Sequence, residues 1–72
     1  NYKVNVSFRE VGSADVEIRL RDAQGREVLF ISDRMQSGTY SRDVDVSQLA
    51  RGIYTVEVKS GGLTAHRRLS LN

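Results

Sequence analysis

The 72-residue sequence contains no cysteine. Disulfide bridges, cysteine-rich zinc sites and a cysteine nucleophile are therefore excluded, while the redox compartment stays open because a cysteine-free chain suits either. A chain of this length has room for one hydrophobic core and is marginally stable unless its apolar side chains are well placed. The sequence therefore predicts a single domain, residues 1–72, whose apolar residues alone hold the fold.

Long apolar runs, an excess of one charge and tryptophan are also missing. The longest apolar run, Val28-Leu29-Phe30-Ile31, is far too short to cross a bilayer. Eleven basic residues face nine acidic ones, with the signs mixed along the chain, which is typical of an ordinary soluble surface. The chain has neither a basic stripe nor aromatic stacking platforms, so we expect no nucleic-acid partner. The absence of tryptophan argues against a carbohydrate-binding face.

Apolar and polar residues alternate with a period of two along most of the chain, which indicates half-buried β-strands. A helical period is missing, so we expect at most one helical turn, over residues 47–50. Short antiparallel strands with turn signals between them predict an all-β fold, an immunoglobulin-like antiparallel β-sandwich of about 6–7 strands. The residues that share inward parity form the predicted core: Val6, Phe8, Val16, Ile18, Leu20, Phe30, Val44, Tyr54, Val56 and Leu69.

The segment from Asp22 to Gly25 predicts a type I hairpin turn in which Gly25 takes a positive φ as a bulge residue. Continued without interruption, this hairpin pairs Leu20 with Val28 and Ile18 with Phe30.

That register places Leu29 and Ile31 on the face opposite the core. Either a neighbouring loop covers them, or they form a docking surface for a partner chain or for weak self-association.

A second hairpin is predicted at Ser60-Gly61-Gly62, with either Ser60-Gly61 or Gly61-Gly62 as its two-residue loop. Both options place Val58 and Ala65 together in the core. Gly52 begins a strand where the chain crosses between sheets, which suggests a close approach of backbones. The last strand is expected to bury four apolar residues, Leu63, Ala65, Leu69 and Leu71.

Residues capable of chemistry are few. His66 is the only histidine, lies at an outward position and has no serine or cysteine partner pattern, so we interpret it as a surface residue. Asp43 and Asp45 share a strand face, but a calcium ion needs six to eight oxygen ligands and no Asp-rich loop supplies the others. We therefore expect no enzyme activity, no metal site and no cofactor.

Several short motifs follow one another over nearly the whole chain. They are Asp22-x-x-Gly25-Arg26-Glu27-Val28, Asp45-x-Ser47-x-Leu49-x-x-Gly52-Ile53-Tyr54-x-Val56, Gly61-Gly62 and Arg67-Arg68-Leu69-x-Leu71. Each motif is weak alone, but the ordered set resembles the C-terminal sorting domain of the bacterial type IX secretion system, which is also called the Por secretion system. The paired lysines customary near the end of the family are arginines here, which keeps the charge and changes the hydrogen-bond geometry.

This resemblance implies a non-catalytic secretion signal at the end of a larger secreted protein of a Bacteroidetes-type Gram-negative bacterium. Its implied partners are an outer-membrane translocon and its shuttle protein, followed by a sortase-like cysteine protease that removes the domain. The implied route runs through the periplasm to the cell surface or the medium, with a signal peptide upstream of this fragment. The residues expected to contact the translocon are Gly52, Tyr54, Arg67, Arg68, Leu69, Leu71 and Asn72. The alternative is a structural or ligand-binding immunoglobulin-like module, such as a spacer or a domain similar to those of flagellar hook-capping proteins.

Overall fold

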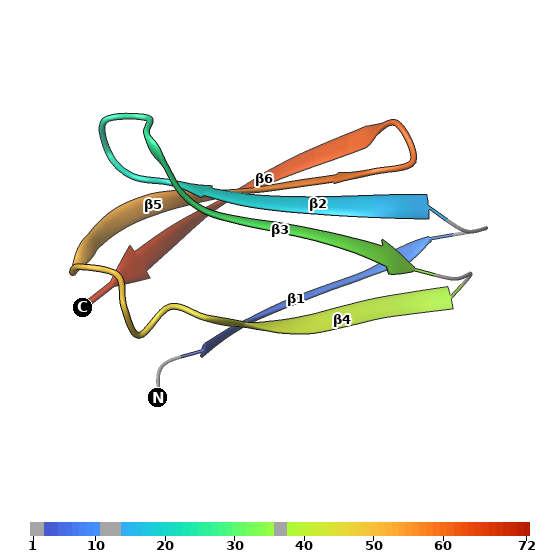
Figure 1. Ribbon diagram of the computed structural model, residues 1–72, viewed down its shortest axis with the longest axis horizontal. Helices are drawn as coiled ribbons and strands as arrows, with labels where there is room; N and C mark the ends of the chain where they lie inside the picture. The colour runs from blue at the N-terminus through green and yellow to red at the C-terminus, as the bar shows by residue number, and fades with distance from the viewer. Residues whose placement is uncertain (1–2, 11–13, 36–37) are drawn as a thin grey trace.

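The computed structural model describes residues 3–10, 14–35 and 38–72, and within these ranges the chain is all-β. The strands are β1 (Lys3–Glu10), β2 (Ala14–Arg21), β3 (Glu27–Met35), β4 (Gly38–Asp45), β5 (Gly52–Ser60) and β6 (Leu63–Leu71). They form two antiparallel sheets, one of strand order β1-β4 and one of order β3-β2-β5-β6 (Figure 1). The predicted immunoglobulin-like sandwich is confirmed. No helix among the described residues is long and apolar enough to span a membrane.

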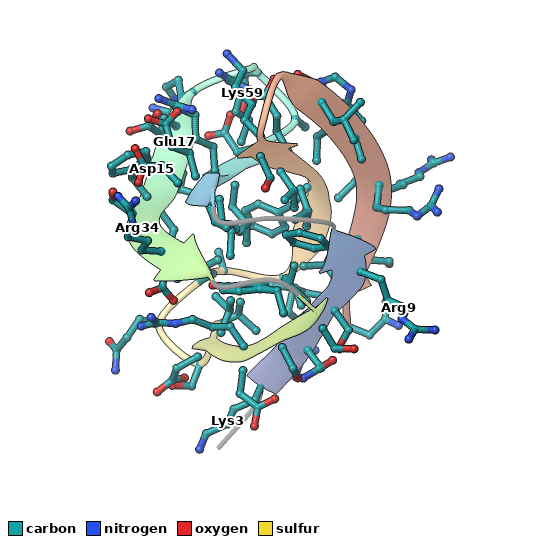
Figure 2. The ribbon with its side chains drawn as sticks, turned by 90° about the vertical axis from the view of Figure 1, so that its right-hand side faces the viewer. Lys3, Arg9, Asp15, Glu17, Arg34 and Lys59 are labelled. Carbon is teal, nitrogen blue, oxygen red and sulfur yellow. The ribbon has the colours of Figure 1, made fainter. Side chains whose placement is uncertain are left out.

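The core lies between the two sheets, and the labelled charged side chains in Figure 2 point away from it. Its most buried residues are alternate positions of β2, because period-two alternation sends one set of side chains to the same face. The buried apolar residues are Val6, Val16, Ile18, Leu20, Tyr40, Val44, Val46, Tyr54, Val56 and Leu71, with Phe8, Leu49, Val58 and Leu69 packed partly buried against them. Phe8 and Tyr40 also stack across the β1–β4 pair, with ring centroids 5.1 Å apart.

The first predicted hairpin turn is confirmed. Gly25 has a φ of 87°, and its N–H donates to the Asp22 carbonyl over 2.9 Å. The Asp22 carboxylate accepts the N–H groups of Gln24 and Arg26. These bonds explain why Asp and Gly are needed at the two ends of this turn.

The register beyond this turn was predicted wrongly. Arg21 pairs with Glu27, but Leu20 then pairs with Leu29 and Ile18 with Ile31, so Val28 is an extra residue in β3. Because of this β-bulge, each β3 side chain after Val28 lies on the face of the sheet opposite to the one that an uninterrupted ladder would give it.

Leu29 and Ile31 consequently pack against the core, and the register that motivated a docking surface at these two residues is incorrect. Phe30, predicted as a core residue, is 45% exposed. The Arg19 guanidinium covers part of its ring, at 4.7 Å from the centroid. Such a cation–π contact shields an aromatic face that the bulge has turned outward.

The second hairpin uses the Gly61-Gly62 loop. Ser60 pairs with Leu63, and both glycines have positive φ, 56° and 84°, as a type I′ turn requires. Val58 and Ala65 are opposite each other as predicted, but Ala65 is exposed and so is Leu63, at 67%. The expected burial of these two β6 residues is therefore wrong, because the two-stranded sheet is too narrow to cover the whole inner face of the four-stranded one.

The connection between β4 and β5 contains a hydrogen-bonded turn instead of a helix. The Leu49 N–H donates to the Val46 carbonyl over 3.0 Å. The Asp45 carboxylate accepts the backbone N–H and the hydroxyl of Ser47, at 2.9 Å and 2.6 Å. This local bonding explains the Asp45-x-Ser47 spacing.

Candidate recognition surface

Strand β6 lies at the edge of the four-stranded sheet, where β5 is its only paired neighbour among the described strands. One side of its backbone therefore has unpaired N–H and C=O groups, which a further strand can use. Leu71 is 4% exposed and Leu69 is partly buried, so these two residues anchor the end of β6 in the core. Asn72, at the exposed end of the chain, lies 3.5 Å from the Ser70 hydroxyl.

Arg67 and Arg68 are exposed and point to opposite faces of β6. Arg67 pairs in register with buried Val56, which places its side chain on the inner face. Arg68 pairs with exposed Thr55, which places its side chain on the outer face. Neither guanidinium forms an ion pair with any described residue.

Tyr54 has a structural role at the start of β5. Its ring is buried and its hydroxyl donates to the carbonyl of Ala50 over 2.6 Å. A tyrosine near the start of such a strand, bonded to the backbone a few residues upstream, is a tyrosine corner of immunoglobulin-like sandwiches. The arrangement fixes the β4–β5 crossing loop against the start of β5.

Gly52 takes a φ of 151°, a conformation that favours glycine, and pairs with Leu71. A Cβ placed on Gly52 meets no heavy atom within 4 Å. The close backbone approach expected at this position is therefore wrong, and the backbone angle alone explains the glycine.

A hydrogen-bonded triad of Arg21, Glu57 and His66 crosses the outer face of β2, β5 and β6. Glu57 Oε1 accepts from Arg21 over 3.0 Å, and its Oε2 lies 3.1 Å from His66 Nε2. The hydrogen bond from Arg21 lowers the pKa of Glu57. The positive charge of Arg21 and the hydrogen bond with His66 lower it further. Sequence reasoning placed His66 correctly at the surface, with a side chain 58% exposed, but did not identify its acidic partner.

The described residues contain no group of three or more His, Cys, Asp or Glu side chains that could hold a metal ion. Asp43 accepts a hydrogen bond from Asn5 over 2.8 Å. Asp45 is occupied by the turn at Ser47.

A groove of about 540 Å³ lies between β1 and β6 and was not predicted. Its walls include Val6 and Phe8 from β1 and Ala65, Arg67 and Leu69 from β6. One signal in the sequence indicates it: Arg67 occupies an inward position between Ala65 and Leu69, where a fully covered sheet would place an apolar residue. An arginine at such a position is typical of a face that solvent reaches.

No curated protein and no solved structure matches the chain significantly. The model of one protein family, described as the secretion system C-terminal sorting domain, matches residues 1–72. The match covers the ordered turn and strand motifs whose local bonding is given above, from Asp22 to the dibasic last strand. The chain therefore belongs to the family of type IX secretion C-terminal sorting domains.

Proposed function

We propose that this domain directs the protein to which it is attached through the type IX translocon to the cell surface. In this proposal the translocon and its shuttle protein bind the folded domain, with β6 as the decisive element. A sortase-like cysteine protease then removes it. The attached protein enters the periplasm by a signal peptide of its own.

The family match over residues 1–72 is the observation on which the proposal rests. Sorting domains of this family are in general non-catalytic, and they imply export to the cell surface or secretion in Bacteroidetes. Fold alone would not be sufficient, because immunoglobulin-like sandwiches have many unrelated functions.

The unpaired edge of β6 supports its role in recognition, since a receptor strand can pair with it while alternate side chains provide selectivity. Arg67 and Arg68 place one cation on each side of this edge and are free of ion pairs with the described residues. Leu69 and Leu71 hold the strand in place.

The test is export of a periplasmic passenger protein fused to residues 1–72 in a type IX host, measured by surface labelling and in the culture medium. With the intact domain, we expect to find the passenger on the cell surface or in the culture medium. With the double variant Arg67→Glu, Arg68→Glu, we expect export to be lost. Circular dichroism must first show that the variant folds. Failure of the intact domain to export the passenger would contradict the proposed function.

The matched control is the double variant Lys3→Glu, Arg34→Glu, which makes the same change of charge away from the β6 edge. Arg34 lies on β3, at the opposite edge of the sheet, and Lys3 begins β1 in the other sheet. Equal loss of export in both variants would indicate an effect of net charge, and normal export by the Arg67, Arg68 variant would exclude the dibasic pair.

A further inference from the structure

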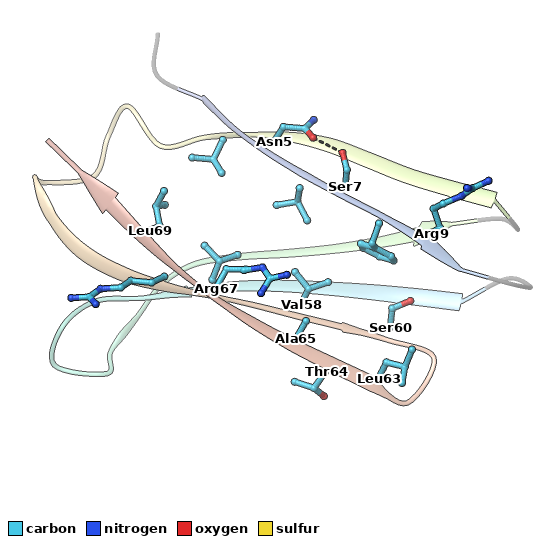
Figure 3. Close-up of a pocket in the computed structure, with 15 residues that line it drawn as sticks. Asn5, Ser7, Arg9, Val58, Ser60, Leu63, Thr64, Ala65, Arg67 and Leu69 are labelled. Atoms are coloured by element: carbon cyan, nitrogen blue, oxygen red, sulfur yellow. Dashed lines mark hydrogen bonds between the residues drawn. The ribbon is translucent and has the colours of Figure 1, made fainter.

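The groove between β1 and β6 presents apolar side chains that the sandwich leaves uncovered. Figure 3 shows Leu63, Ala65, Arg67 and Leu69 along β6 and Val58 on the neighbouring strand, facing the gap beneath β1. The apolar side chains that line the groove are Val4, Val6, Phe8, Val56, Val58, Leu63, Ala65 and Leu69. Val6 and Val56 are buried, whereas Leu63 is 67% exposed, so coverage decreases along β6 toward the Gly61-Gly62 turn. An exposed apolar face of this kind marks an interaction site.

Both walls of the groove are strand edges. In the described sheets β1 pairs only with β4, and β6 pairs only with β5. An extended chain that enters the groove therefore finds unpaired backbone groups and an apolar floor at the same place. These are the two requirements for recognition by strand addition, in which the backbone gives affinity and alternate side chains give selectivity.

The charges around the groove have one sign. Arg67 faces the groove, Arg9 and Arg68 belong to its lining from strand positions whose side chains face outward, and no aspartate or glutamate is among its lining residues. Elsewhere in the described chain the pattern differs, because five other arginines form ion pairs: Arg19, Arg21, Arg26, Arg34 and Arg42. An unpaired cation beside an apolar surface favours a partner with a carboxylate. A second copy of this chain would place its own groove arginines against these and is disfavoured.

We propose that the groove between β1 and β6 binds an extended segment of a partner protein by strand addition, with apolar side chains toward the floor and a carboxylate that pairs with Arg67. The proposal deepens the proposed function and rests on it, because the groove uses the same β6 edge and the same Arg67. It concerns a binding site on the isolated domain, so an export assay and a binding assay can succeed or fail separately.

The probe is a seven-residue peptide, Thr-Val-Thr-Glu-Thr-Val-Thr, with acetylated and amidated ends. Its valines and glutamate lie on one face of an extended strand. The matched peptide has lysine in place of glutamate. Titration followed by calorimetry and by NMR amide shifts should show at least about tenfold tighter binding of the glutamate peptide, with the largest shifts in β1 and β6. Equal affinities, or no binding of the glutamate peptide, would overturn the proposal.

Two variants of the domain sharpen the test. Arg67→Glu should reverse the preference between the peptides, whereas Arg34→Glu, on β3 at the opposite edge of the sheet, should leave it unchanged. Ala65→Tyr places a ring in the groove at an exposed strand position, where tyrosine is well tolerated, and should abolish binding of both peptides. Unchanged affinity in the folded Ala65→Tyr variant would contradict the location.

Strand pairing is tested with a glutamate peptide that is N-methylated at alternate amides on the pairing side. We expect loss of binding, because methylation removes the donors that pair with a strand edge. Retained binding would reject strand addition. Sedimentation of the domain alone completes the test: a dimer that Ala65→Tyr dissociates would identify a second copy as the occupant and overturn the proposal.

Discussion

Gly25 has a φ of 87°, which residues with a Cβ adopt only at a cost. A Cβ at Gly25 would meet no heavy atom within 4 Å, so crowding adds nothing to that cost. We expect Gly25→Ala to lower the free energy of unfolding by about 1 kcal/mol and Gly25→Asn to lower it by less, because asparagine tolerates positive φ. Urea denaturation of both variants measures the difference. Equal losses would show that the backbone angle is not the cause.

The Tyr54 hydroxyl is the other single group with a clear energetic role. Tyr54→Phe keeps the buried ring and removes only the donor to the Ala50 carbonyl. We expect a loss of about 1 kcal/mol in the free energy of unfolding, as for an ordinary intramolecular hydrogen bond. The control is Ser70→Ala, which removes an exposed hydroxyl whose bond to Asn72 is 3.5 Å long and should cost much less. An unchanged urea midpoint for Tyr54→Phe would show that the corner does not stabilise the fold.

Features that depend on neighbours in the sequence could be predicted from the sequence. The predicted turn at Asp22 is closed by a side chain that bonds the backbone two and four residues away. The same chemistry closes the turn at Asp45, where the sequence predicts at most one helical turn. The inward position of Tyr54 likewise follows from alternation within one strand. Each of these needs no knowledge of the other sheet.

At the scale of the element, the bulge in β3 decides which apolar side chains enter the core. We expect Leu29→Ala to lower the free energy of unfolding by about 2 kcal/mol, because Leu29 packs against the core. Val28→Ala should change it by less than about 0.5 kcal/mol, because Val28 is 37% exposed and unpaired in the ladder. Chemical denaturation of the two variants checks the register. A larger loss for Val28→Ala than for Leu29→Ala would support the uninterrupted hairpin register instead.

The bulge could not be predicted because apolar and polar residues do not alternate where it occurs. Residues 28–31 are all apolar, so either register buries two apolar side chains and exposes two others. Tertiary packing selects the bulged register. It packs Leu29 and Ile31 into the core and leaves Phe30 under the Arg19 guanidinium.

At the scale of the whole molecule, alternation predicts which face of a strand is inward but not how much of that face is covered. Leu63 and Ala65 have the inward parity expected of them and are nevertheless exposed, since β1 and β4 are the only described strands that lie over the four-stranded sheet. The groove is therefore a property of the two sheets together. In the sequence, only Arg67 indicates the groove, and this signal can be recognised only once the register of β6 is known.

Acid stability is also a property of the whole molecule, because carboxylates in different parts of the fold have a pKa below the usual value. The Arg26 N–H lowers the pKa of Asp22, the Arg34 N–H together with Tyr40 and Arg42 lowers the pKa of Asp33, and the Ser47 hydroxyl lowers the pKa of Asp45. Arg21 does the same for Glu57. A carboxylate whose pKa is lower in the folded state contributes stability above its unfolded pKa, which is about 4.

This contribution disappears as the pH falls from about 4 through the lowered folded-state values, because the unfolded chain then binds more protons than the folded one. We therefore expect the urea midpoint to be steady from neutral pH to about pH 5 and to fall steeply below about pH 4. Asp33→Asn should be less stable at neutral pH and should lose less stability on acidification, because asparagine keeps an acceptor for the Tyr40 hydroxyl but has no proton to bind. A midpoint that stays constant down to about pH 2 would contradict the contribution of these carboxylates.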